Sequence, residues 1–245
     1  MTLTNALIAI NVAVFLWELA TGAVIADRGW LDGASVVVHG EWWRIVTAAF
    51  LHGSVMHIAF NMFALYQVGT IVEKAMGPLR YLLVYACAIA GSGAAVIWFN
   101  YTQATLGASG AIFGLFGALV AIGLSLPPRG MSIVTQTVPI IAINLVLGFV
   151  IPNISVAAHV GGLLTGFAVG WLVFQIPSRY RDRANALING RPVYAAAAAG
   201  DAGAIGAVPF DPREEDDVET IEQPPDAGPH EEEGAPPLEI RDPRE

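Results

Sequence analysis

The sequence carries little charge and almost no cysteine. Charged side chains make up 13% of the 245 residues, 55% are hydrophobic, and the mean hydropathy is +0.57. Soluble domains usually contain about 25% charged residues. The single cysteine, Cys87, excludes an intramolecular disulfide framework and a cysteine-based metal site. The low charge therefore indicates a protein that crosses a membrane several times.

The few charges are unevenly placed along the chain. Residues 1–176 hold five basic and five acidic side chains, so the net charge of −9 comes from residues 177–245. That last segment is rich in Ala, Gly, Pro, Asp and Glu and has little to bury, which is typical of disorder. We therefore expect a membrane domain over 1–176 and an acidic, disordered cytoplasmic tail over 177–245. Nucleic acid is not an expected partner, because the chain lacks the necessary basic surface.

Six apolar stretches come close to the roughly 20 residues that a helix needs to cross the hydrocarbon core. Turn-forming residues separate them, such as Gly77-Pro78 and Pro127-Pro128. Because lipid offers the backbone no hydrogen-bond partners, each stretch must be helical. The sequence thus predicts an all-α bundle of six transmembrane helices. The expected spans are Leu3–Ala23, Ser54–Val72, Leu79–Phe99, Ser109–Leu126, Ser132–Val150 and Val156–Ile176.

Basic residues near the ends of the spans predict their orientation. Lys74 and Arg80 flank the second connection, Arg129 lies in the fourth, and three more arginines follow the last span. Loops of this kind face the cytoplasm, so we expect both termini there and place the chain in a bacterial plasma membrane. No basic residue precedes Leu3, which favours a retained first span over a cleaved signal.

The first loop, residues 24–53, is long and rich in aromatic side chains. Trp30, Trp42 and Trp43 suit a membrane–water interface better than open water. The loop could be an aromatic anchor, or it could be partly sunk beside a site. The adjacent pair Trp43 and Arg44 is compatible with both interpretations.

Polar side chains inside the bilayer are costly, so function is expected where they gather. Ser109 begins the fourth predicted span, and His159 lies in the first turn of the sixth. His57 and Asn61, four residues apart near the start of the second span, share one helix face. These three spans all begin on the outer side, which brings the four residues to a similar depth. His52 comes just before the second span.

This arrangement would suit nucleophilic catalysis by Ser109. A hydroxyl at a helix start can attack a carbonyl, and the new oxyanion would meet the unpaired backbone N–H there. His159 is the candidate base, if the two helices bring nitrogen and oxygen to about 2.6–3.2 Å. Small residues on both helices permit such an approach. They are Gly110, Gly114, Gly117 and Ala121 in the fourth span and Gly162, Gly166 and Gly170 in the sixth.

Each residue also has a purely structural interpretation. Serine is common as a helix N-cap, and a histidine or asparagine in a membrane can simply join helices. His52 could be a hydrogen-bonding residue of the loop. The coincidence of depth and spacing favours catalysis over these separate alternatives. No aspartate or glutamate is expected near Ser109 and His159, which predicts a Ser-His dyad rather than a triad.

Together the motifs resemble those of the rhomboid family of intramembrane serine proteases, over essentially all of residues 1–176. Four segments occur in the family's order. In the chain they are Trp43-Arg44, His57-Ile58-Ala59-Phe60-Asn61, Gly107-Ala108-Ser109-Gly110, and Ala158-His159 with Gly162 and Gly166.

The resemblance implies an endopeptidase that cleaves transmembrane segments through an acyl-enzyme intermediate. Ser109 would be the nucleophile and His159 the general base, while His57 and Asn61 would join the Ser109 N–H in an oxyanion hole. The family needs no metal and no other cofactor. Its substrates are usually single-pass membrane proteins in the lipid bilayer, and the fifth span would act as a lateral gate. Supporting roles are expected for His52, Gly107, Gly110, Phe113, Trp43, Arg44, Gly162 and Gly166.

One residue departs from the pattern of some relatives. Phe113 stands where they carry a tyrosine, four residues after the serine, so it could stack on His159 but has no hydroxyl. Two other functions are conceivable. A rhomboid-like pseudoprotease that escorts clients is disfavoured by the intact Ser109 and His159, and a small transporter by the few polar groups in the spans.

Overall fold

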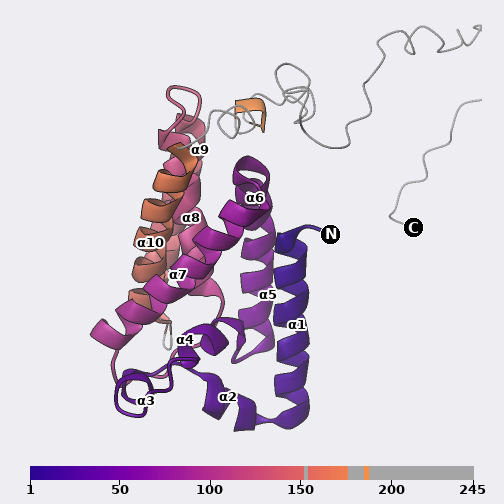
Figure 1. Cartoon of the computed structure of the whole chain (residues 1–245), viewed down its shortest axis with the longest axis vertical. Helices are drawn as coiled ribbons and strands as arrows, with labels where there is room; N and C mark the ends of the chain where they lie inside the picture. The colour runs from indigo at the N-terminus through magenta and orange to yellow at the C-terminus, as the bar shows by residue number, and fades with distance from the viewer. Residues whose placement is uncertain (152–153, 176–184, 188–245) are drawn as a thin grey trace, which may run out of the picture. The chain divides into compact units, whose positions relative to one another are not determined.

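The structure, a computed structural model, describes residues 1–151, 154–175 and 185–187. Throughout this part the regular elements are helical, apart from an isolated bridge between Leu31 and Thr105. The predicted all-α bundle is confirmed, and Figure 1 shows its long helices side by side. Five segments are long and apolar enough to cross a membrane: α1 (Leu3–Thr21), α5 to α6 (Val55–Met76), α7 (Pro78–Phe99), α9 (Met131–Val150) and α10 (Val156–Gln175).

The second span runs four residues beyond its predicted end at Val72, because nothing breaks the helix before Gly77. Gly77 has a φ of 81°, which stops the helix, and Pro78 starts the next one. At the other end the Ser54 hydroxyl accepts the N–H of His57, as an N-cap does. The span consists of α5 (Val55–Ala64), the π-helical turn η2 (Leu65–Gly69) and α6 (Thr70–Met76).

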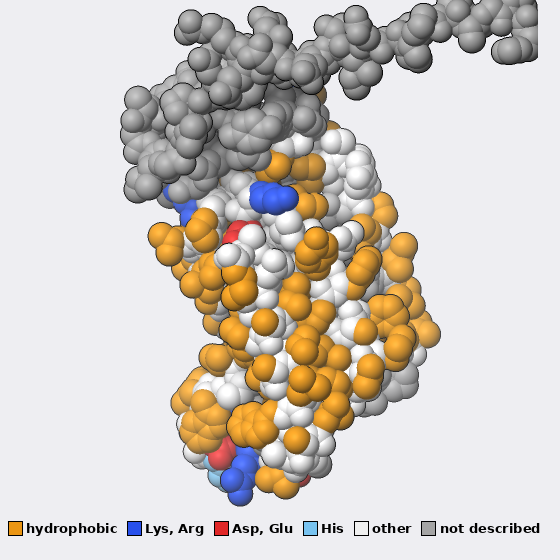
Figure 2. Space-filling model, turned by 90° about the vertical axis from the view of Figure 1, so that its right-hand side faces the viewer, with side chains coloured by type: hydrophobic (Ala, Val, Ile, Leu, Met, Phe, Trp, Pro, Cys, Tyr) orange, Lys and Arg blue, Asp and Glu red, His pale blue; other side chains and the backbone are white. Residues whose placement is uncertain are grey.

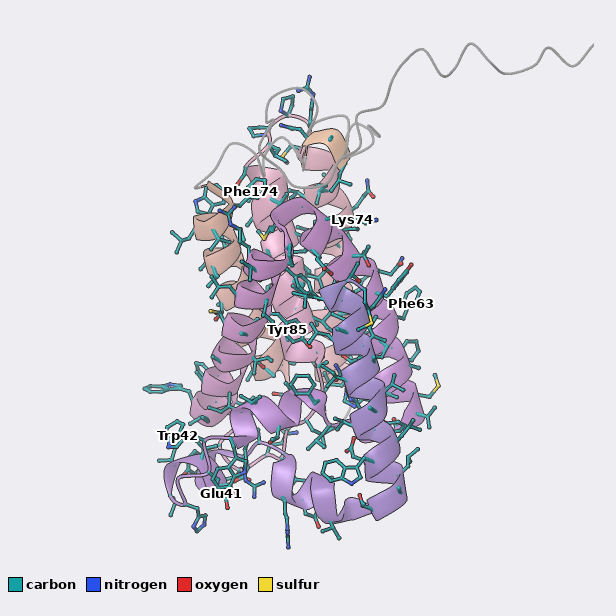
Figure 3. All side chains as sticks on the ribbon, turned by 45° about the vertical axis from the view of Figure 1, so that its right-hand side comes forward. Glu41, Trp42, Phe63, Lys74, Tyr85 and Phe174 are labelled. Atoms are coloured by element: carbon teal, nitrogen blue, oxygen red, sulfur yellow. The ribbon has the colours of Figure 1, made fainter. Side chains whose placement is uncertain are left out.

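The first loop folds into four short helical elements. The carboxylate of Asp32 caps one of them by accepting the N–H of Ser35 at 2.8 Å. Figure 3 shows Glu41 and Trp42 of this loop at one end of the bundle and Lys74 at the other. The elements are α2 (Ala23–Gly29), α3 (Gly33–Val37), α4 (Arg44–Thr47) and the 3-10 turn η1 (Ala48–Phe50).

The fourth predicted span is the shortest of the six. It forms α8 (Ser109–Leu124), a helix of 16 residues that ends two residues before the predicted Leu126. At about 1.5 Å per residue it is about 24 Å long, less than the roughly 30 Å of a hydrocarbon core. Most of its side chains are buried, because α7, α9 and α10 pack around it. Ser109 is the first residue of this short central helix.

Helices α8 and α10 touch through their backbones. A β-carbon on Gly162 would overlap the carbonyl oxygen of Gly110, and one on Gly166 would overlap that of Gly114. Only glycine permits contact this close. The close approach that the small-residue stripes predicted is therefore present, and it fixes the axial register of the two helices.

The outer surface of the bundle suits a lipid environment. On the face in Figure 2, charged side chains lie at the two ends, and the middle is apolar. Phe63 points away from the bundle, whereas Tyr85 is enclosed within it (Figure 3). Only 11% of the apolar stretch of α9 is buried inside the bundle, so most of this helix is open to lipid. The chain is an integral, multi-pass membrane protein.

Most of the predicted tail lies outside the described residues, and so does the prediction that it is disordered. Of the segment 177–245, the structure describes residues 185–187, which form a short helical turn. Ala186 is buried there, and Leu187 packs against the main apolar core.

The backbone contact between α8 and α10 leads to a stability prediction. Gly166→Ala puts a methyl group against the Gly114 carbonyl, so the helices must separate, and overpacking of this kind costs about 1–3 kcal/mol. We expect a lower midpoint of thermal unfolding in detergent micelles. Gly53→Ala is the control, because its β-carbon would meet nothing nearer than 3.8 Å. Equal midpoints for the two variants would contradict the prediction.

Candidate active site

Ser109 and His159 form the centre of the site. The Oγ of Ser109 lies 2.9 Å from Nε2 of His159, across 50 residues of sequence. Ser109 is the first residue of α8, so its backbone N–H has no acceptor within the helix. His159 is buried in the first turn of α10. A hydroxyl and an imidazole at this distance are a nucleophile and a base within proton-transfer reach.

The ring of His159 is held by stacking. Its centroid lies 4.1 Å from that of Phe113, with 10° between the ring planes. Phe113 follows Ser109 by four residues, so both project from one face of α8. The predicted stacking is confirmed, although Phe113 has no hydroxyl. Within the described part of the chain, no hydrogen-bond partner reaches Nδ1 of His159.

Gly107 shapes the approach to Ser109. Its φ of +122° is a conformation that other residues rarely adopt, and its N–H donates to the carbonyl of Ala48 at 2.8 Å. A β-carbon there would lie 2.7 Å from Nε2 of His57 and 3.9 Å from Oγ of Ser109. Glycine thus leaves open a space that His57 and Ser109 share, and this places His57 beside the dyad.

Asn61 makes a hydrogen bond within its own helix. Its Nδ2 donates to the carbonyl of His57, one turn earlier, at 3.0 Å, and its side chain is buried. No hydrogen bond joins Asn61 to Ser109 in the described residues. One amide hydrogen is therefore occupied within the helix, and only the second could serve a ligand.

His52 lies against His57, as a supporting residue would. Their ring centroids are 5.1 Å apart in an edge-to-face arrangement, and Nδ1 of His52 lies 3.3 Å from the carbonyl of Phe50. Burial, and then the positive charge that His57 can carry, lower the pKa of His52 to about 4. His52 is therefore neutral at neutral pH, and His57 packs against an uncharged ring.

Glu18 is a residue that the sequence reasoning missed. Its buried carboxylate in α1 accepts the backbone N–H of His52, with the nearer oxygen at 3.0 Å. The expectation of no nearby acid concerned Ser109 and His159 only, and it did not consider an acid beside His52. It was based on span ends and overlooked that a side chain can reach a neighbouring loop. The sequence did contain a signal, because Glu18 is an acidic residue inside the first apolar stretch.

The pair Trp43-Arg44 organises the first loop at a distance from the dyad. Arg44 is buried, pairs with Glu41 at 2.5 Å and donates to the carbonyls of Asp27 and Trp30. Trp43 is 55% exposed. In the described residues, no hydrogen bond or ring contact joins either side chain to Ser109 or His159. Arg44 begins α4, which is followed directly by η1 and the Ala48 carbonyl that accepts the Gly107 N–H.

The described residues contain no group of three or more His, Cys, Asp or Glu side chains that could hold a metal ion. The chemistry available at the site is that of a serine hydroxyl, three imidazoles and an amide. Next to these groups, Gly110 and Gly162 make the backbone contact between α8 and α10. These groups suit acyl transfer by a nucleophile and a base.

Comparisons with known proteins agree with this geometry. A family model described as the Rhomboid domain matches residues 39–176, more than half of the chain. Rhomboid protease GluP of Bacillus subtilis (strain 168) is 42% identical over 172 residues, which are 68% of this chain and 34% of GluP.

Two further relatives come from a plant and from another bacterium. RHOMBOID-like protein 6, mitochondrial, of Arabidopsis thaliana is 35% identical over 162 residues, 64% of this chain and 52% of that protein. Rhomboid protease AarA of Providencia stuartii is 27% identical over 213 residues, 73% of this chain and 75% of AarA.

This chain spans about half or less of the first two relatives, 34% and 52% of their lengths. The matched region nevertheless includes all four motifs, from Trp43 to Gly166. The chain belongs to the rhomboid family.

Proposed function

We propose that the protein is an intramembrane serine endopeptidase that cleaves membrane proteins. The observation that carries the proposal is the 2.9 Å between Ser109 Oγ and His159 Nε2, on helices of a membrane-embedded bundle. The names of GluP and AarA, both called rhomboid proteases, support the same activity.

In the proposed mechanism, Nε2 of His159 takes the hydroxyl proton as Ser109 Oγ attacks the scissile carbonyl carbon. Collapse of the tetrahedral intermediate breaks the C–N bond, and His159 returns the proton to the leaving amine. Water then attacks the acyl-enzyme with His159 as base, which releases the new carboxylate and restores the hydroxyl. For Nε2 to accept a proton, the resting tautomer must carry its hydrogen on Nδ1.

The oxyanion would be stabilised by three donors. The backbone N–H of Ser109 is free of helix bonding at the start of α8, where the helix dipole is positive. His57 lies across the space left by Gly107. The second amide hydrogen of Asn61 would be the third donor, because the first is bound to the carbonyl of His57.

Substrates would reach the site from the lipid. Among the five long helices described, α9 is the most exposed, because only 11% of its apolar stretch is buried inside the bundle. It is therefore the helix that is most easily displaced. This supports α9 as the lateral gate. A single transmembrane helix is the unit that such an opening admits, so we propose single-pass membrane proteins as substrates.

One prediction of this proposal concerns the dyad. Ser109→Ala removes the nucleophile and His159→Ala removes the base, so cleavage of a transmembrane substrate reconstituted in vesicles should fall about 10³-fold or more in each. A fluorophosphonate should label Ser109 in the wild type and in neither variant. The fraction of cleaved substrate on a gel and the labelled band measure both effects.

Matched controls come from the same chain. Ser125→Ala removes a hydroxyl that donates to the Ala121 carbonyl at the far end of α8, and His39→Ala removes an exposed imidazole from the first loop. Both should cleave at the wild-type rate. Turnover retained by a folded Ser109→Ala or His159→Ala variant would refute the dyad. Client binding that survives Ser109→Ala, without any cleavage by the wild type, would favour an escort function.

A second prediction concerns Phe113. Phe113→Leu removes the ring that stacks on His159, and stacking of this kind is worth about 0.5–1.5 kcal/mol, so kcat should fall about two- to tenfold. Phe113→Tyr keeps the ring and should retain activity. Phe116→Leu removes a neighbouring ring that lacks a stacking contact with His159 in the described part, and its kcat should stay within twofold. Equal kcat values for the two leucine variants would contradict the role of stacking.

We also propose that the chain lies in a bacterial plasma membrane with both termini in the cytoplasm. Two of the three relatives named above are bacterial. The basic residues Lys74, Arg80 and Arg129 follow the positive-inside rule for this orientation.

Cysteine labelling tests the orientation, because Cys87 is the only native thiol. In a Cys87→Ser background, His39→Cys should react with a membrane-impermeant maleimide in intact cells. Arg129→Cys, at the opposite end, should react only after the cells are permeabilised. The reverse pattern would overturn the orientation, and Cys87→Ser alone gives the background labelling.

A further inference from the structure

Within the described residues, no third residue hydrogen-bonds to His159 in the way that usually orients a catalytic imidazole. Its Nδ1 finds no partner in the part of the chain that the structure describes, and Phe113 covers one ring face. The position of the ring therefore depends on how the first turn of α10 is placed. Whatever fixes this turn also fixes the distance from Nε2 to the Ser109 hydroxyl.

Ser155, the residue before α10, organises that first turn. Its Oγ accepts the N–H of Ala158 at 3.2 Å, and its carbonyl accepts the N–H of His159 at 3.2 Å. The side chain of Ser155 is buried. The two bonds join Ser155 directly to the backbone of the proposed base and of the residue before it.

Asn100 connects this turn to another helix. Its Nδ2 donates to the Oγ of Ser155 at 3.0 Å, across 55 residues of sequence. Asn100 is itself well fixed at the end of α7, because its N–H donates to the Val96 carbonyl and its own carbonyl accepts the N–H of Gln103. The amide therefore ties the start of α10 to a rigid helix end.

Helices α7 and α10 also meet at a second contact, farther along both helices. Near the middle of α7, the carbonyl oxygen of Gly91 lies 2.6 Å from where a β-carbon on Gly161 would be, so the two backbones touch there. The glycine contacts with α8 set the depth of α10, and the two contacts with α7 restrict its rotation. His159 lies between these points along α10, so its side-chain direction depends on both.

We propose that Asn100 is a positioning residue for His159, acting through the Ser155 hydroxyl. This role rests on the proposed protease function. Without the Asn100 amide, the first turn of α10 keeps its cap but loses its link to α7, and the imidazole then samples orientations in which Nε2 does not face Ser109. The consequence is a slower chemical step with substrate binding unchanged.

The test measures kcat and KM for cleavage of a transmembrane substrate in vesicles. Asn100→Ala should lower kcat about tenfold, as misplacement of a catalytic group does, and should leave KM within twofold. The rate at which a fluorophosphonate labels Ser109 should fall in parallel. Gln103→Ala is the matched control, because it removes an exposed amide from the same loop, and it should match the wild type.

A double-mutant cycle assigns the effect to the pair. Ser155→Ala should lower kcat at least as much as Asn100→Ala, since it removes the cap as well. Asn100→Ala made in the Ser155→Ala background should then cost less than twofold, because the amide has lost its acceptor. The thermal midpoints of all variants are measured in micelles, to separate unfolding from misplacement.

The outcomes are distinct. A selective fall in kcat that disappears in the Ser155→Ala background supports the proposal. A wild-type kcat in Asn100→Ala, a rise in KM alone, or an undiminished loss in the double variant overturns it. If the wild type shows no cleavage that depends on Ser109, the proposed protease function fails instead.

Discussion

The site depends on the backbone contact between α8 and α10. Gly110 and Gly162 touch one residue after Ser109 and three after His159, where any larger side chain would push the helices apart. Because a helix is stiff, contact at this level and again at Gly114 and Gly166 fixes the relative depth of the two helix segments that carry the polar side chains. The four glycines thus set the depth at which the hydroxyl and the imidazole face each other, 2.9 Å apart.

The outer side of the site is built by loop segments held to one another through backbone groups. The Gly107 N–H is bound to the Ala48 carbonyl, and Leu31 and Thr105 form a bridge. In a membrane such bonds contribute more to stability than in water, because lipid offers an unpaired backbone group no hydrogen-bond partner. The first loop is thus joined to the segment that precedes Ser109, and the buried Arg44 holds that loop together through Glu41, Asp27 and Trp30.

The sequence predicted the helices and the proximity of Ser109 and His159 because both leave local signals. These signals are apolar runs of fixed length, and polar residues where polarity is costly. It did not predict how short α8 is, since the apolar run continues to Leu126 while the helix ends at Leu124. The contacts of Glu18 with His52 and of Asn100 with Ser155 bridge 34 and 55 residues. No local pattern encodes such pairs, because they depend on how separate helices are arranged. Asn61 was placed on the correct helix face, but its bond to the His57 carbonyl depends on the rotamer.

The absence of an acid on His159 in the described residues has a physical rationale. A carboxylate buried beside the imidazole would have to be desolvated within an apolar bundle, which costs several kcal/mol unless it is fully paired. Orientation by packing avoids that cost. Phe113 holds the ring plane, the glycine contacts set the depth, and the Asn100–Ser155 bond limits rotation, each with uncharged groups. Packing of uncharged groups can therefore orient the imidazole without the cost of desolvating a charge.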